Sequence, residues 1–124
     1  MSMQESYTLE RDNLFAATQM MPVVADEIEI PSGTGQLKRG SLLTAEGKLV
    51  KKTVESEPAS TTFDAVYAVL AQDVDATSAT VKAAVFLTGE FNEAAMIVDT
   101  ANSATVADFK VSARNVGIFI KKNL

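Results

Sequence analysis

Apolar residues occupy both faces of the two strands that the sequence predicts within residues 63–92. A strand with one face in water keeps that face polar, so two apolar faces predict central strands that are covered on both sides. A turn-rich connector, residues 73–80, separates them. The first strand has Phe63, Ala65, Tyr67, Val69 and Ala71 on one face and Val66, Ala68 and Leu70 on the other. The second has Val81, Ala83, Val85, Leu87 and Phe91 on one face and Ala84, Phe86 and Thr88 on the other.

The part of the chain before this pair also predicts strands. Glu27 and Glu29 alternate with apolar residues, which is typical of a strand with one wet face. Gly40 interrupts a second strand and predicts a bulge or a bend there. Lys38 and Arg39 are interpreted as charges that protect an exposed strand edge, with an anion site as the alternative. The predicted segments are a strand at 23–30, a turn at 31–35, a strand at 36–44, a turn at 45–48, a strand at 49–54 and an exposed loop at 55–62.

The C-terminal part predicts a single helix. Residues 104–114 have helical spacing, Ser103 precedes them as a candidate N-cap, and Gly117 lies just beyond the end. Residues 117–122 predict a terminal strand, whereas residues 93–99 either extend the sheet or begin a new strand. The predicted class is therefore mainly β with one short α-helix in the C-terminal half.

The first 21 residues show no clear period. Leu14, Ala17 and Met21 have helical spacing, an extended arm is equally compatible, and a frayed terminus is the third alternative. The density of large apolar side chains argues against a purely solvated tail. We therefore predict an N-terminal arm at residues 1–21 and a single domain at residues 22–124.

Composition excludes several classes of function. The 124 residues include no Cys and no His, which removes disulfides, thiolate nucleophiles and histidine chemistry. The formal net charge of −5 arises within residues 1–30, which hold six acids and one base. Lys and Arg are not clustered as phosphate contacts require, so no nucleic acid partner is expected. No stretch approaches the roughly 20 apolar residues of a membrane span, and the acidic start lacks a signal-peptide pattern, so we expect no membrane partner and synthesis in the cytoplasm.

Two acid pairs are the remaining candidates for chemistry. Asp73 and Asp75 fall in the predicted turn, where aspartate side chains accept hydrogen bonds from backbone N–H groups, and the alternative is a hard-cation site. Glu90 and Glu93 are interpreted as solvated carboxylates. The glycine-bearing motif of the β-rich trimeric dUTPases is not present. We therefore predict no enzyme activity, no cofactor and no metal.

Four segments carry a resemblance to a known family. In order and spacing they resemble the phage lambda-type head decoration (capsid cement) proteins, over residues 22–122. The sequence departs from that pattern at its ends, in the acidic arm and in a C-terminal helix with few basic residues. The segments are PVVADEIEIPSGTGQLKRGSLL (22–43), YAVLAQDVDAT (67–77), VFLTGEFNEAA (85–95) and ARNVGIFIKK (113–122).

The resemblance implies a β-tulip or β-clip-like domain that forms a homotrimer on the outer surface of the mature icosahedral head. It also implies a virion protein that binds the major capsid protein, stabilises the head against internal DNA pressure, and has a flexible N-terminal arm that becomes ordered on the capsid. An arm ordered by strand addition needs apolar contacts, so the candidate capsid-binding residues are Tyr7, Leu9, Leu14 and Phe15. The alternative is a small virion-surface adhesive or ligand-binding β-module. The absence of Trp and the presence of only two Tyr count against a carbohydrate binder.

Overall fold

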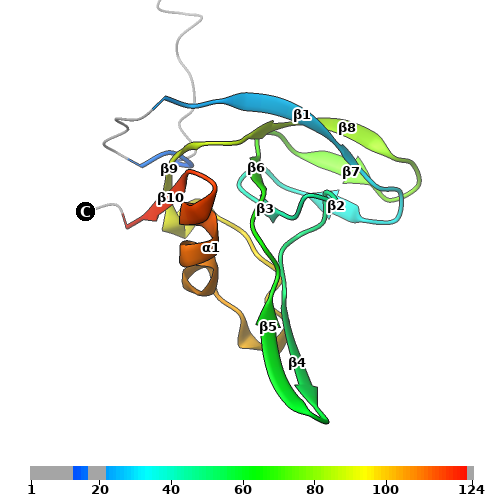
Figure 1. Cartoon of the computed structure of the whole chain (residues 1–124). Coiled ribbons are helices and arrows are strands. Elements are labelled where there is room, and N and C mark those ends of the chain that lie inside the picture. The colour runs from blue at the N-terminus through cyan, green and yellow to red at the C-terminus, as the bar shows by residue number, and fades with distance from the viewer. Residues whose placement is uncertain (1–12, 17–21, 123–124) are drawn as a thin grey trace, which may run out of the picture.

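The computed structural model describes residues 13–16 and 22–122 (Figure 1). Within these residues the fold is mainly β, with one short α-helix and no closed barrel, which confirms the predicted class. The elements are β1 Ala25–Ile30, β2 Gly35–Leu37, β3 Leu42–Leu43, β4 Lys52–Ser56, β5 Ala59–Phe63, β6 Ala68–Leu70, β7 Val74–Ala76, β8 Val81–Phe86, β9 Gly89–Asn92, α1 Lys110–Asn115 and β10 Ile118–Lys121.

A four-stranded antiparallel sheet in the order β1-β8-β6-β3 forms the centre of the fold. Its two interior strands, β8 and β6, come from the segment predicted to be central. Successive residues of β6 enter different hydrophobic cores, Val69 one core and Ala68 and Leu70 the other. The prediction of doubly covered strands is therefore confirmed for β6, which lies between the two cores. The predicted bounds are wrong, because residues 63–71 divide into the end of β5 and β6, with Phe63 and Tyr67 exposed, and residues 81–92 divide into β8 and β9.

The two cores have different neighbours. The first lies between the sheet and the β9, β10 and α1 side of the molecule, and the second lies on the side of β2 and β7 (Figure 1). The first core contains Leu14, Leu42, Val50, Val66, Val69, Phe91, Met96, Val98, Ala104, Phe109, Ala113, Ile118 and Ile120. The second contains Ile30, Leu37, Leu43, Ala68, Leu70, Ala76, Ala83 and Val85.

Gly40 bends the chain between β2 and β3, as the sequence predicts. It has a φ of +98°, and a Cβ at this position would lie 2.5 Å from the carbonyl oxygen of Ala95. Both the backbone conformation and the close approach therefore require glycine. Before Gly40 the chain pairs as β2 with β7, and after it β3 joins the central sheet.

Two predicted irregular segments prove to contain strands. The predicted loop 55–62 is the outer part of a hairpin, in which β4 and β5 pair from Lys52↔Phe63 to Ser56↔Ala59 and project from the body (Figure 1). The predicted turn 73–80 contains β7. Both predictions were wrong because short strands rich in Ser, Thr, Asp and Glu lack an apolar pattern, and cross-strand neighbours rather than burial decide their pairing.

The C-terminal half contains a shorter helix than the sequence predicts. A capping box between Thr105 and Asp108 starts a 3₁₀ turn, Val106–Phe109, and the α-helix proper is α1. The predicted N-cap, Ser103, instead ends an earlier 3₁₀ turn. The predicted terminal strand is confirmed as β10, which pairs in parallel with β9. Residues 93–99 are wrongly predicted as a strand, because Glu93–Ala95 forms a 3₁₀ turn and Ile97 makes a single bridge to Ser41.

Candidate functional site

Residues 13–16, here called the arm anchor, lie along β9 as a short extra strand. Phe15 and Phe91 form an antiparallel bridge. The Ala16 N–H donates to the Glu90 carbonyl at 2.9 Å, and the Asn92 N–H donates to the Leu14 carbonyl at 2.7 Å. Since β9 also pairs with β10, the arm anchor completes a three-stranded arrangement around β9.

Two side chains hold the arm anchor on the domain. Leu14 is 1% exposed and belongs to the first core. Phe15 is half-buried, with its ring stacked at 5.1 Å on Phe91 and edge-on at 5.0 Å to Phe86. These separations lie within the range in which aromatic pairs attract one another. The arm anchor is therefore packed into the domain, and its attachment does not rest on backbone hydrogen bonds alone.

The Arg39 guanidinium covers the aromatic cluster. Its central carbon lies 6.0 Å from the centroid of the Phe15 ring and 5.5 Å from that of Phe86. A guanidinium N–H donates to the Ala71 carbonyl at 2.8 Å, which orients the side chain, and the Arg39 N–H donates to Asp73 at 2.8 Å. Arg39 thus makes cation–π contacts with both rings. The sequence indicated only a charge at a strand edge, because nothing local predicts a partner 24 residues earlier in the chain.

The structure brings together two of the four predicted capsid-binding residues. Leu14 and Phe15 are adjacent in the arm anchor and face their own domain. Tyr7 and Leu9 lie outside the described residues. The division into an arm at residues 1–21 and a domain at residues 22–124 stays a prediction, although residues 13–16 pack with the domain. Phe15 pairs with Phe91 as a strand residue would, whereas Asn13 forms a bend with a φ of +62°.

The acid pairs have structural partners. Asp75 Oδ1 accepts hydrogen bonds from the Thr77 hydroxyl at 2.6 Å and from the Thr77 N–H at 3.0 Å. The expected acceptance of a backbone N–H is confirmed, although Asp75 lies in β7 rather than in a turn. The side-chain hydrogen bond from Thr77, followed by the backbone one, lowers the pKa of Asp75 below its ordinary value. No group of three or more acidic side chains that could hold a metal occurs among the described residues.

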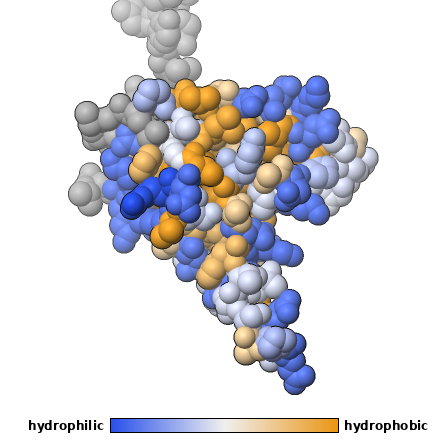
Figure 2. Space-filling view, viewed as in Figure 1, coloured by the Kyte–Doolittle hydropathy of each residue, from blue (hydrophilic) through white to orange (hydrophobic). Residues whose placement is uncertain are grey.

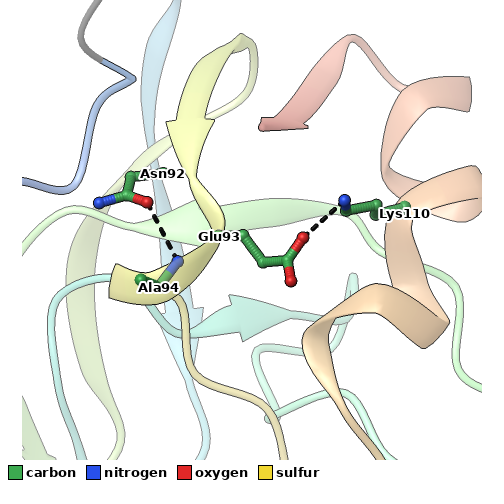
Figure 3. Close-up of polar contacts among 4 residues, drawn as sticks. All are labelled: Asn92, Glu93, Ala94 and Lys110. Atoms are coloured by element: carbon green, nitrogen blue, oxygen red, sulfur yellow. Dashed lines mark hydrogen bonds and ion pairs between the residues drawn. The ribbon is translucent and has the colours of Figure 1, made fainter. Parts of the chain in front are cut away.

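Glu90 and Glu93 were predicted to be solvated, and that interpretation is wrong. Glu90 forms an ion pair at 2.9 Å with Lys121 of β10, and its side chain is 12% exposed. Glu93 forms an ion pair with Lys110 at the start of α1, while the neighbouring Asn92 side chain accepts from the Ala94 N–H (Figure 3). The two carboxylates therefore connect β9 and the turn after it to β10 and α1.

The fold and the site together define a class of small, mainly β structural domain with an N-terminal segment held on an outer strand. Residues 7–116 match the family model described as bacteriophage lambda head decoration protein D. The chain belongs to this family, so it is a structural phage protein that decorates the capsid. A search of curated proteins returned no match. Within the described residues, no helix has the length and apolar character to span a membrane.

Proposed function

We propose that the protein binds the outside of the mature head as a homotrimer, contacts the major capsid protein and stabilises the shell against the pressure of packaged DNA. Family membership supports attachment to the capsid. The observation that carries the finer proposal is the arm anchor: because residues 13–16 are held on β9, the residues before them join the domain at a fixed point.

Because residues 13–16 are already ordered on β9, ordering the rest of the arm on the capsid costs less conformational entropy. Each residue that becomes ordered loses about 1–2 kcal/mol of backbone entropy, so an anchor that is already ordered removes four residues from that cost. The remaining 12 residues reach about 40 Å when extended. That length is enough to cross onto a neighbouring subunit, where strand addition and apolar side chains compensate for the ordering.

The four candidate residues then have two different roles. Tyr7 and Leu9 precede the arm anchor, and we assign them direct contact with the capsid. Leu14 and Phe15 face their own domain, so we assign them a positioning role, in which they fix the point from which the arm begins. Three arms in a trimer bind with a high effective concentration, which converts modest affinity per arm into firm attachment.

Co-sedimentation with mature, expanded heads that lack the protein tests this proposal. The full chain should sediment with the heads at micromolar concentration, and heads that carry it should release their DNA at a higher temperature than bare heads. Absence of co-sedimentation would refute capsid binding by this chain.

Two variants isolate the arm. Deletion of residues 1–12 keeps the arm anchor, and Tyr7→Ser/Leu9→Ser removes only the proposed apolar contacts. Both should weaken binding and leave the circular dichroism spectrum unchanged. Val111→Ser is the matched control, because Val111 is apolar, 77% exposed and outside the arm. Normal binding by the deletion variant would overturn the role of the arm.

A further inference from the structure

The β4–β5 hairpin is exposed on all sides. From residue 51 to residue 65 no side chain is buried, which is the longest such run in the described part of the chain. Figures 1 and 2 show the hairpin standing clear of the body. An isolated two-stranded ribbon is only marginally stable in water, so a hairpin of this kind gains from a contact outside its own chain.

The two faces of the hairpin differ in chemistry. The register places Lys52, Val54 and Phe63 on one face, together with Ser56, Ala59 and Thr61. Val54 is 51% exposed and Phe63 is 45% exposed, although both are apolar. The opposite face has only Thr53, Glu55, Ser60 and Thr62. One face is therefore suited to a partly apolar surface, and the other is polar and carries Glu55 near the outer end.

The base of the hairpin is fixed on the body. The Phe63 ring lies edge-on to the buried Phe109 ring at 5.7 Å, and the Lys52 ammonium lies 5.8 Å from the Phe63 centroid. The Asn102 amide donates to the Lys52 carbonyl at 2.8 Å. These contacts fix the orientation of the hairpin relative to the body. Glu55 and Glu57, at its outer end, are therefore held in a defined position.

The same chain has a groove of complementary character. It lies between the turn at residues 31–34 and the segment that leads into β4, and the ammonium groups of Lys48 and Lys51 give it positive charge. Neither lysine side chain has an ion pair among the described residues. Asp99 also lines the groove, where its carboxylate accepts a hydrogen bond from the Ala101 N–H, so the lining keeps one net positive charge. Pro31, Leu37 and Leu49 supply apolar lining.

We propose that the hairpin of one copy docks in this groove of a second copy of the chain. A hairpin cannot fill its own groove, because Lys51 immediately precedes β4 and five strand residues carry the outer end about 17 Å away from it. The docking joins two different surfaces, the hairpin with Glu55 and Glu57 on one copy and the groove with Lys48 and Lys51 on the other. The contact is therefore head-to-tail, and such a contact closes into a ring when the rotation between copies permits.

This inference rests on the proposed homotrimer and specifies which surfaces form it. It assigns the hairpin and the basic groove to contacts between copies, and leaves the arm for the capsid. The two surfaces are separate, so variants can disable one without the other.

Charge reversal in the full chain tests the docking. The wild-type chain should have three times the 13.2 kDa mass of one chain by sedimentation equilibrium. Glu55→Lys/Glu57→Lys should reduce this to the mass of one chain, and so should Lys48→Glu/Lys51→Glu. The variant with all four changes restores opposite charges across the contact and should recover the trimer. Glu27→Lys/Glu29→Lys, with the same charge change on exposed residues of β1, is the matched control and should stay trimeric.

The apolar face has its own test. Val54→Asp should dissociate the trimer, whereas Val111→Asp introduces the same side chain at an exposed valine of α1 and should not. Circular dichroism of each variant checks that the fold is kept. The docking would be overturned if the wild-type chain is a monomer or if the charge variants stay trimeric. It would also be overturned if the variant with all four charge changes does not recover the trimer. Co-sedimentation of the wild-type chain with heads is measured separately. A wild-type monomer that binds heads would refute the docking and leave the proposed function standing. A wild-type trimer that does not bind heads would refute the proposed function and leave the docking standing.

Discussion

The substitution Leu14→Ala should open the arm anchor while the rest of the domain stays folded. Leu14 is fully packed in the first core, and truncation of a buried leucine to alanine costs about 2–5 kcal/mol. Apart from Leu14, the contacts described for residues 13–16 are two backbone hydrogen bonds, the ring contacts of Phe15 and the burial of Ala16. These must offset about 4–8 kcal/mol for ordering four residues, so the anchor depends on Leu14.

Hydrogen exchange measures this opening directly. The Asn92 N–H donates to the Leu14 carbonyl, so it exchanges when the anchor detaches. A loss of 2–5 kcal/mol corresponds to a fall of roughly 30- to 4,000-fold in its protection. The Leu70 N–H, which donates to the Ser41 carbonyl at 2.9 Å inside the central sheet, serves as the internal reference and should change less.

Leu37→Ala is the matched control, because it truncates a buried leucine of the second core. It should lower the protection of the Leu70 amide without a selective effect at Asn92. Equal loss at both amides in Leu14→Ala would show that the anchor opens only with the whole domain. Unchanged protection of Asn92 would show that Leu14 does not hold the anchor.

Three further predictions test the surroundings of the anchor. Arg39→Met should lower the free energy of unfolding by about 1–3 kcal/mol in urea, because two cation–π contacts and a hydrogen bond are lost, and an unchanged urea midpoint would contradict that role. Gly40→Ala should destabilise the fold more than Gly33→Ala, since both have positive φ but only Gly40 has a neighbour, the Ala95 carbonyl, within 4 Å; equal effects would refute the steric argument. The depressed pKa of Asp75 stabilises the folded state above the ordinary value of 3.8, and this contribution is lost as pH falls through the lower folded pKa. The stability difference between wild type and Asp75→Asn should therefore be present at neutral pH and shrink in acid, and a constant difference would contradict the linkage.

Burial on both faces made the central strands predictable from the sequence. Residues 68–70 and 83–86 are apolar at successive positions, and their buried side chains enter one or the other of two cores. The bend at Gly40 was also predictable, since glycine inside a strand pattern signals an unusual backbone. Both features have a local physical cause. For the strands it is the run of apolar residues, and for the bend it is the single residue Gly40.

The hairpin and the arm anchor could not be predicted in the same way, because their partners are distant or external. Residues 55–62 are mostly polar, which is typical of a loop, and only the register with a facing strand makes residues 52–63 a hairpin. The apolar density around Leu14 and Phe15 was a correct signal that these residues are packed, but it did not indicate against what. The partner is β9, more than 70 residues later in the chain.

The arm anchor also connects the stability of the domain to attachment on the head. If the arm binds the capsid only when residues 13–16 are held on β9, the apparent affinity falls in proportion to the fraction of molecules with a closed anchor. The coupling is reciprocal, so a capsid that orders the arm must favour the closed anchor by the same free energy. Under this proposal Leu14 and Phe15 influence binding without touching the capsid, and we predict that the Asn92 amide becomes more protected on decorated heads than in the free protein.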